Sequence, residues 1–244
     1  MSSSKTVLVV AATGQQGGAT VRYLQPLGSF TIRGLTRNPD SPAAQKLANS
    51  GVWVFKGDMF DKASLVAPLK GVACAFFMTD ARSPQGVEGD VTQGNAFISA
   101  CKEAGVKHVV YSSVNSPDRC NGTAIFECKL RVEKPLQEAG FKWTIIRPVC
   151  FMENLPLGGF GRWFLLGMWA AVLQGKKVQM VSTEDIGAVA ARALTAPDEF
   201  HGKIIELAGD ELTVGDMQVA FNRATGERVW KAWIPKWIAM RLVP

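Results

Sequence analysis

The sequence predicts an α/β protein built on a doubly wound parallel β-sheet, with a small C-terminal α+β subdomain. Short apolar segments rich in Val, Ile and Phe alternate with helix-forming segments as far as Pro148. The first apolar segment, residues 6–10, runs directly into a glycine-containing turn. The chain has 244 residues, 47% of them hydrophobic and 20% charged, which suits one folded α/β domain with an appendage.

The first predicted strand and its turn indicate a phosphate site. Residues 6–10 are β-branched except for Leu8, which is typical of a central parallel strand covered on both faces. Ala11, Gly14 and Gly17 follow with a spacing close to the Gly-x-Gly-x-x-Gly fingerprint of dinucleotide sites. A helix expected over residues 16–24 directs its free N–H groups at the turn, where a pyrophosphate fits. A tight strand-to-helix turn without a ligand is the alternative.

The end of the second predicted strand, residues 30–36, indicates which nucleotide is bound. Enzymes that use NAD usually place an acid here to hold the ribose hydroxyls. No acid occurs between Phe30 and Asn38, and the strand ends at Arg37. An arginine can donate paired hydrogen bonds to a 2′-phosphate, so the sequence predicts NADP(H). A solvated surface arginine is the alternative.

The alternation of helices and strands then continues, which predicts right-handed parallel crossovers. Helices are expected at residues 42–50, 62–69, 85–104 and 124–139, and strands at 52–56, 72–77 and 107–111, before a sixth strand ends at Pro148. Asp58 follows the third strand and is expected beside the adenine, with a turn or helix N-cap as the alternative. Thr79 follows the fourth strand and is expected beside a ribose, with a plain turn residue as the alternative.

The usual acid–base pair of short-chain dehydrogenases is incomplete. Those enzymes place Tyr-x-x-x-Lys on the helix after the fifth strand. The lysine is Lys129, but Ile125 stands where the tyrosine belongs. The two tyrosines of the chain, Tyr23 and Tyr111, fall on the first helix and in a strand. Lys129 is expected to point toward a ribose, and a solvated surface lysine is the alternative.

Taken together, these motifs resemble the NmrA-like group of atypical short-chain dehydrogenases. The resemblance is carried by residues 11–18, 36–39, 57–58, 110–113, 126–129 with 132–133, 147–148 and 153–155, in the order and spacing of that group. It implies a Rossmann domain that binds NADP(H), with relatives that are either reductases or NADP(H)-responsive regulators. Ala11 stands where the group has its first glycine.

The resemblance also implies roles for individual residues. The matching positions are Thr13, Gly14, Gln16 and Gly17 for the pyrophosphate, Arg37 for the 2′-phosphate, Asp58 and Thr79 beside the adenosine, Lys129 at the nicotinamide ribose, and Pro148, Phe151 and Asn154 beside the nicotinamide. In reductases of this group the lysine assists catalysis without a tyrosine, which makes Lys129 the candidate catalytic residue.

After Pro148 the alternating pattern ends. We expect the nucleotide-binding domain to span residues 1–155 and a C-terminal subdomain, covering a substrate or partner, to span residues 156–244. In the second part we expect a helix starting near residue 182, a strand at 203–207 and a helix at 213–224. The apolar run 163–173 is a packed helix, a pocket wall or lid, or a contact with a second copy or membrane. Three tryptophans between cations in residues 229–240 suggest packing on the subdomain or a homodimer.

Composition argues against several classes of protein. The net charge of +6 is spread along the chain, so no direct contact with nucleic acid is expected. The odd number of five cysteines and the absence of a C-x-x-C pair suggest reduced thiols of a cytoplasmic protein, or a nuclear one if it is a regulator. No ligand spacing for a metal is present. The longest apolar run is too short for a transmembrane segment, which needs about 20 residues.

Two functions of different classes remain. One is an NADPH-dependent reductase of a hydrophobic small molecule, favoured by the apolar run that follows the expected nicotinamide loop. The other is a non-catalytic NADP(H) sensor that signals through a protein partner, favoured by the missing tyrosine.

Overall fold

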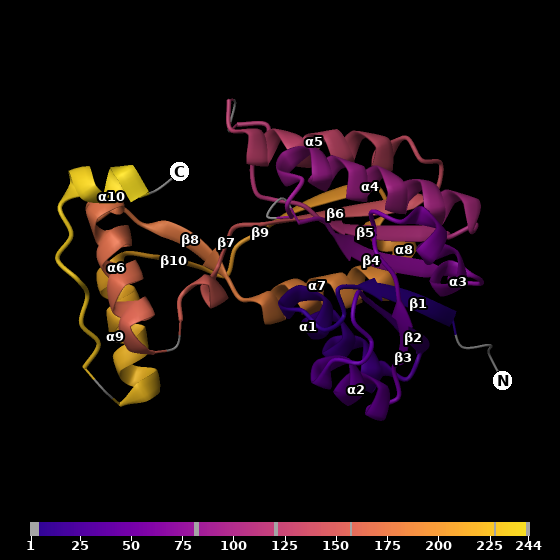
Figure 1. The fold of residues 1–244 in the computed structure, drawn as a ribbon, viewed down its shortest axis with the longest axis horizontal. Coiled ribbons are helices and arrows are strands. Elements are labelled where there is room, and N and C mark those ends of the chain that lie inside the picture. The colour runs from indigo at the N-terminus through magenta and orange to yellow at the C-terminus, as the bar shows by residue number, and fades with distance from the viewer. Residues whose placement is uncertain (1–4, 81–82, 120–121, 157, 227, 243–244) are drawn as a thin grey trace. The chain divides into compact units, whose positions relative to one another are not determined.

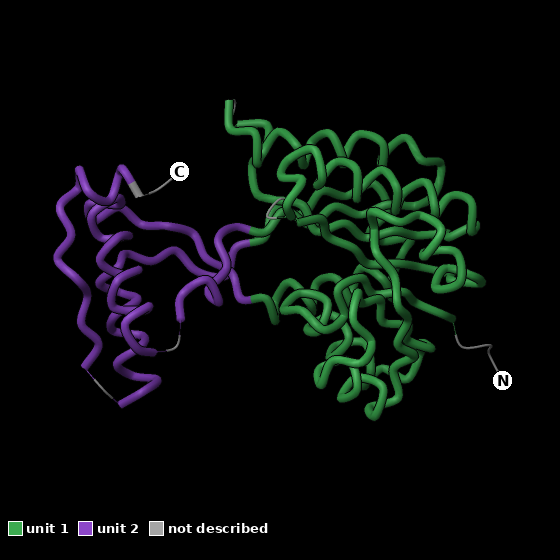
Figure 2. Tube along the Cα trace, viewed as in Figure 1, with its two compact units in different colours: residues 1–148, 183–207 green, residues 149–182, 208–244 purple. Residues whose placement is uncertain are grey.

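The computed structural model describes residues 5–80, 83–119, 122–156, 158–226 and 228–242 (Figure 1). The chain divides into two compact units (Figure 2). Unit 1 comprises residues 1–148 and 183–207, and unit 2 comprises residues 149–182 and 208–244. The expected division at residue 155 differs from this one in two ways, because residues 149–155 belong to unit 2 and residues 183–207 belong to unit 1.

Unit 1 is built on a seven-stranded sheet in which every neighbouring pair of strands is parallel. Its strands, in sheet order, are β3 (Trp53–Lys56), β2 (Phe30–Thr36), β1 (Lys5–Val10), β4 (Cys74–Met78), β5 (His108–Ser112), β6 (Lys142–Pro148) and β9 (Lys203–Leu207). The strand order reverses between β1 and β4, which creates the crevice where such sheets bind ligands. The predicted Rossmann-type fold is confirmed.

Helices cover both faces of this sheet (Figure 1). They are α1 (Gln15–Leu24), η1 (Gln25–Leu27), α2 (Pro42–Asn49), η2 (Lys62–Leu65), α3 (Val66–Leu69), α4 (Gly86–Glu103), α5 (Ala124–Gln137), α7 (Thr183–Thr195) and α8 (Pro197–Phe200). Phe97 of α4 and Leu136 of α5 lie in the core of one face, and Leu24 of α1 and Leu194 of α7 in that of the other. Helices η2 and α3 replace the single helix expected at 62–69, and Pro68 lies in the first turn of α3, where its missing N–H is tolerated.

Two segments expected in the C-terminal subdomain belong to unit 1 instead. Strand β9 pairs in parallel with β6, from Thr144 opposite Lys203 to Pro148 opposite Leu207. Helix α7 packs closely on α1, because Gly187 has no side chain and a Cβ there would lie 2.5 Å from the Cβ of Ala19. The sequence pattern of a helix followed by a strand fits either unit. The pairing of β9 with β6 and the packing of α7 on α1 place both segments in unit 1.

Unit 2 is an α+β subdomain around a three-stranded sheet. The order is β10 (Asp210–Leu212), β8 (Val178–Val181) and β7 (Cys150–Phe151), with β10 antiparallel and β7 parallel to β8. Its helices are η3 (Met152–Asn154), α6 (Gly159–Leu173), α9 (Val214–Thr225) and α10 (Lys236–Leu242). The predicted helix at 213–224 is α9, whose N-terminus is closed by a capping box between Thr213 and Asp216.

The apolar run 163–173 lies within α6, and its middle residues 166–168 are buried, whereas Trp163 and Val172 are exposed. Leu166 is fully buried, in a core shared with Met180 and Met217. Gly167 packs directly against the backbone of Ala232, since a Cβ would lie 2.5 Å from the carbonyl oxygen. No helix among the described residues has the length and apolar character needed to cross a membrane.

Candidate functional site

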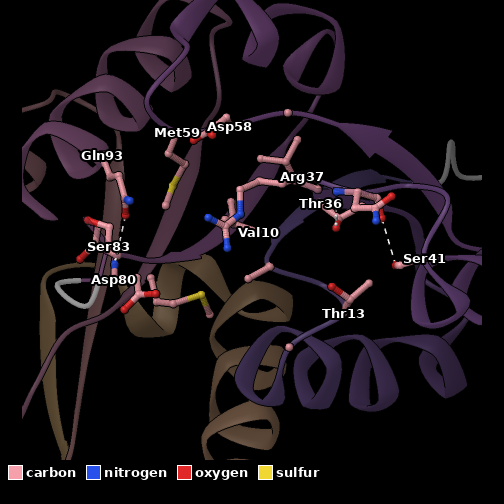
Figure 3. Close-up of a pocket in the computed structure, with 17 residues that line it drawn as sticks. Val10, Thr13, Thr36, Arg37, Ser41, Asp58, Met59, Asp80, Ser83 and Gln93 are labelled. Atoms are coloured by element: carbon pink, nitrogen blue, oxygen red, sulfur yellow. Dashed lines mark hydrogen bonds between the residues drawn. The ribbon is translucent and has the colours of Figure 1, made fainter. Parts of the chain in front are cut away.

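A cavity of about 390 Å³ lies in unit 1 where the carboxyl ends of four neighbouring strands meet (Figure 3). Strands β1 and β4 flank the point at which the strand order reverses, and β2 and β3 extend the floor to one side. The lining residues include Thr13 and Gly14 after β1, Arg37 and Asn38 after β2, Asp58 and Met59 after β3, and Thr79 and Asp80 after β4. The volume and position suit a nucleotide.

The turn after β1 brings the backbone close to this cavity. Gly14 caps α1 and donates its N–H to the carbonyl of Ala11, at 2.8 Å. Gly17 lies against the same carbonyl, and an added Cβ would come within 2.3 Å of its oxygen. Ala11 itself adopts the left-handed conformation, with φ of +49°. The turn therefore needs the conformation that glycine supplies most readily at position 11 and the space that only glycine leaves at position 17.

The first turn of α1 presents backbone donors at the cavity. The first amides of a helix have no intrahelical acceptor. In α2 the Ser41 side chain caps the helix by accepting from the Ala44 N–H, whereas no side chain of the described residues caps α1 at Gly14. The dipole and the amides at this end favour an anion. Thr13 and Gly14 line the cavity at this point, and their contact with a pyrophosphate stays a prediction.

Arg37 supplies a cation to the cavity. Its side chain extends between the turn after β1 and the Asp58–Met59 segment (Figure 3). The residue is exposed, and within the described ranges its guanidinium forms no ion pair. The loop that carries it is held by hydrogen bonds from the Ser41 hydroxyl to the Asn38 carbonyl and from the Asp40 N–H to the Asn38 side chain. A guanidinium with free donors on an ordered loop is suited to a phosphate.

Asp58 and Thr79 line the same cavity, but both already form hydrogen bonds. Asp58 accepts the Phe60 N–H through Oδ1 at 2.9 Å, which is the turn-capping role considered from the sequence. Contact of Asp58 with adenine remains a prediction. Gln93 of α4, which sequence reasoning missed, lines the cavity and accepts the N–H of Asp80 at 3.1 Å. Gln93 is a buried polar residue on a helix, and its burial is the one signal that could have marked it as a site residue.

Lys129 does not line the cavity, but it contacts Thr79, which does. Its Nζ lies 2.6 Å from Asp90 Oδ2 and 2.9 Å from Thr79 Oγ1. Tyr111 hydrogen-bonds the same Thr79 hydroxyl, at 3.1 Å. Burial raises the pKa of Tyr111 well above its ordinary value, so this tyrosine is a neutral hydrogen-bonding group, as expected from its place in a strand. Sequence reasoning missed Asp90.

The other predicted residues of unit 1 lie near the ends of β1, β5 and β6. Gln16 accepts a hydrogen bond from Ser112, at 2.6 Å, which joins the glycine turn to the end of β5. Pro148 is buried at the end of β6, and its carbonyl accepts the Asn115 N–H. Next to it, Arg147 forms a buried pair with Glu133. These contacts fix the strand ends on the far side of β4.

Phe151 and Asn154 belong to unit 2. Phe151 is half-buried in β7 and Asn154 is exposed at the end of η3. The Asn154 amide donates to the Cys150 sulfur at 3.7 Å, and burial raises the pKa of this thiol above its ordinary value. Their predicted place beside a nicotinamide stays a prediction. Among the described residues, no group of three or more His, Cys, Asp or Glu side chains could hold a metal ion.

The residues present fit NADP(H) as a ligand. The close approach of Gly17 to Ala11 holds the start of α1 against the turn after β1, where Thr13 and Gly14 line the cavity. Arg37 stands at the end of β2, where the 2′ position of an adenosine ribose is bound in this fold. Thr79 lines the cavity and accepts a hydrogen bond from the Lys129 ammonium.

Comparisons with known proteins agree with this geometry. The model of the NmrA-like family matches residues 3–244. The NmrA-like family domain-containing oxidoreductase malD of Malbranchea aurantiaca is 32% identical, in an alignment that covers 98% of this chain and 78% of that protein.

Two solved structures are also similar. The NADPH-dependent quinone oxidoreductase QOR2 from Escherichia coli, complexed with NADPH, has a TM-score of 0.71 and 27% identity, over 94% of this chain and 78% of that one. The negative transcriptional regulator NmrA, in complex with NADP, has a TM-score of 0.78 and 21% identity, over 94% and 74%. The second likeness shows the fold alone. With the family match spanning nearly the whole sequence, the chain belongs to the NmrA-like family.

Proposed function

We propose that this protein is an NADPH-dependent oxidoreductase that reduces an uncharged, hydrophobic small molecule. The observation that carries the proposal is Arg37, an exposed guanidinium without an ion-pair partner among the described residues, in a cavity that begins at the glycine turn. A cation at this position of the cavity favours NADP(H) over NAD(H), because only NADP(H) carries the 2′-phosphate.

Each part of unit 1 would hold a different part of the cofactor. The α1 amides and Gly14 would bind the pyrophosphate, and Arg37 the 2′-phosphate. Asp58 and Met59 would lie beside the adenine, and Lys129 would hold the nicotinamide ribose. When bound, NADPH supplies a hydride from C4 of its nicotinamide ring.

The class of substrate is inferred from the relatives and from unit 2. The similar protein from Escherichia coli is named for quinone reduction, and the relative from Malbranchea aurantiaca is named an oxidoreductase. Phe151 and Asn154, matched to the nicotinamide loop, lead into the largely apolar helix α6. An apolar wall of this kind suits a neutral aromatic or conjugated substrate. The role of unit 2 as a cover for that substrate is part of this proposal.

The test has two steps. Calorimetry with NADPH and with NADH measures binding, and NADPH is expected to bind at least about tenfold more tightly, the size of one charge-assisted hydrogen bond. The loss of absorbance at 340 nm is then followed with a panel of quinones, imines and enones. Oxidation of NADPH by at least one compound supports the proposal, and equal affinity for both nucleotides contradicts it.

A specific observation favours the second candidate, an NADP(H) sensor. Ile125 occupies the place of the usual tyrosine and is about half exposed, so the pair that normally transfers the proton is absent. Tight NADPH binding without turnover across the whole panel would favour the sensor, in which cofactor occupancy alters binding to a protein partner.

A further inference from the structure

A buried ion pair joins three elements at the edge of the nucleotide cavity. Lys129 of α5 pairs with Asp90 of α4, with 2.6 Å between Nζ and Oδ2. The Asp90 side chain is completely buried, and the Lys129 side chain is 12% exposed. The ammonium also reaches the end of β4, where Thr79 lines the cavity.

Every polar hydrogen in this cluster has an acceptor. The Lys129 ammonium donates to the Thr79 carbonyl at 3.2 Å, to the Thr79 hydroxyl at 2.9 Å and to Asp90 Oδ2. The Thr79 hydroxyl has one hydrogen, which it donates to Asp90 Oδ1. It therefore accepts from both Lys129 and Tyr111, which uses its two lone pairs. A network satisfied in this way holds the ammonium in one place.

The same network keeps the Lys129 ammonium against the Asp90 carboxylate. Loss of the Lys129 contact would leave the Asp90 carboxylate buried without its counter-ion, and an uncompensated buried charge is strongly destabilising. The longest of the three hydrogen bonds, to the Thr79 carbonyl, is the one that a ligand hydroxyl can replace at least cost. Such a replacement keeps Asp90 paired and directs one N–H of the ammonium at the ligand.

We propose that Asp90 is the positioning residue for Lys129, and that it holds the ammonium in the place where it orients the cofactor ribose. This inference rests on the proposed function for the identity of the ligand. It goes beyond that function by assigning Asp90, a buried residue of a helix that carries no predicted site residue, to the same site.

The chain offers a matched control for this ion pair. Glu88 and Arg131 connect the same two helices, α4 and α5, but both side chains are exposed, at 73% and 50%. Each lies two residues from its counterpart in the buried pair. Glu88→Gln therefore removes a carboxylate between the same helices without touching the cavity, and Asp90→Asn removes the one that holds Lys129.

The first experiment needs neither cofactor nor substrate. Proton–nitrogen NMR correlation of lysine ammonium groups detects only those whose exchange with water is slowed by burial and hydrogen bonding. The Lys129 signal is assigned by its absence in Lys129→Arg. We expect this signal in the wild type and in Glu88→Gln, and we expect it to vanish in Asp90→Asn. A signal that survives Asp90→Asn, or one that the wild type lacks, overturns the proposal.

The second experiment measures NADPH affinity by calorimetry. Asp90→Asn is expected to weaken binding about tenfold, the size of one charge-assisted hydrogen bond, while Glu88→Gln leaves it unchanged. Equal affinity of Asp90→Asn and the wild type overturns the proposal. If the wild type binds no NADPH, the proposed function fails, and the NMR comparison still decides the role of Asp90.

A second substitution covers the case in which Asp90→Asn does not fold. Thr79→Val keeps the shape of the side chain and the ion pair but removes one acceptor from the ammonium. It is expected to broaden the Lys129 signal and weaken NADPH severalfold, whereas Thr79→Ser restores both. A Thr79→Val protein that matches the wild type in both measurements overturns the proposal.

Discussion

Gly17 lies directly against Ala11 in the turn after β1, and a Cβ on Gly17 would come within 2.3 Å of the Ala11 carbonyl oxygen. Ala11 holds this geometry with φ of +49°, which costs an L-residue about 1 kcal/mol relative to glycine. The turn thus carries strain at position 11 that the usual glycine of this fingerprint would remove.

Ala11→Gly is therefore expected to stabilise the protein, by about 0.5–1 kcal/mol. For a chain of this size the melting temperature should rise by roughly 2–4 °C, as followed by calorimetry or circular dichroism. NADPH affinity should be unchanged, since the turn keeps its conformation. Ala12→Gly, at the buried neighbour outside the left-handed region, is the control and should destabilise. A lower melting temperature for Ala11→Gly would contradict this account.

Replacement of Arg37 tests the choice of nucleotide. Arg37→Ser removes the cavity guanidinium and is expected to weaken NADPH by about 10- to 100-fold, the range of a charged, paired hydrogen bond to phosphate. NADH affinity should change little, since NADH has no 2′-phosphate. Arg192→Ser, which removes an exposed arginine paired with Glu199, is the control. Equal losses for both nucleotides would refute the role given to Arg37.

His108 makes stability depend on pH. It is 2% exposed, and burial, with the nearby positive charges of His201 and Lys142, lowers its pKa from 6.5 to about 4. The unfolded chain takes up a proton in this window that the folded chain excludes. Stability from this group is complete above pH 6.5 and falls as the pH drops toward 4, by about 3 kcal/mol.

The measurement is urea denaturation at pH 7 and pH 4.5, in the wild type and in His108→Gln. The substitution removes the titrating group, so the loss of stability at the lower pH is expected to be smaller than in the wild type. His201→Gln, at an exposed histidine, should leave most of the pH dependence in place. A wild-type pH dependence that persists unchanged in His108→Gln would show that other groups cause it.

Glu133 is expected to be essential for the stability of unit 1. Its carboxylate accepts two hydrogen bonds from Arg147, at 3.1 and 2.7 Å, and one from Ser113, at 2.6 Å. Glu133→Gln removes the buried carboxylate partner of Arg147 and leaves the guanidinium with the more exposed partners Asp118 and Glu206, at a cost of about 2 kcal/mol. Glu199→Gln breaks an exposed pair and should cost less than about 1 kcal/mol. Denaturant unfolding checks both values, and similar costs would contradict the distinction.

Much of the nucleotide cavity could be predicted from the sequence because its parts follow strand ends directly. Thr13, Gly14, Arg37, Asp58 and Thr79 each come within a few residues of a predicted strand, and all five line one cavity. In a parallel sheet the carboxyl ends of the strands share one edge, so local position along the chain fixes where these residues lie.

The residues that the sequence analysis missed depend on contacts between distant segments. Asp90 lies on the face of α4 that also carries Gly94, Phe97 and Cys101, and all four are buried. A carboxylate on an otherwise apolar face of a helix is the sequence signal that could have marked Asp90 as a site residue. Its partner on α5 is 39 residues away, and periodicity within one helix does not identify the neighbouring helix.

The sequence by itself determined the Rossmann-type sheet, the glycine turn and the arginine at the end of β2. Each follows from the spacing of residues along one strand, one turn or one helix start. Only the tertiary structure decided that residues 203–207 complete the main sheet and that Asp90 holds Lys129. Both depend on which surfaces pack together, such as Gly187 on Ala19, and that is settled by side-chain size and burial across the fold.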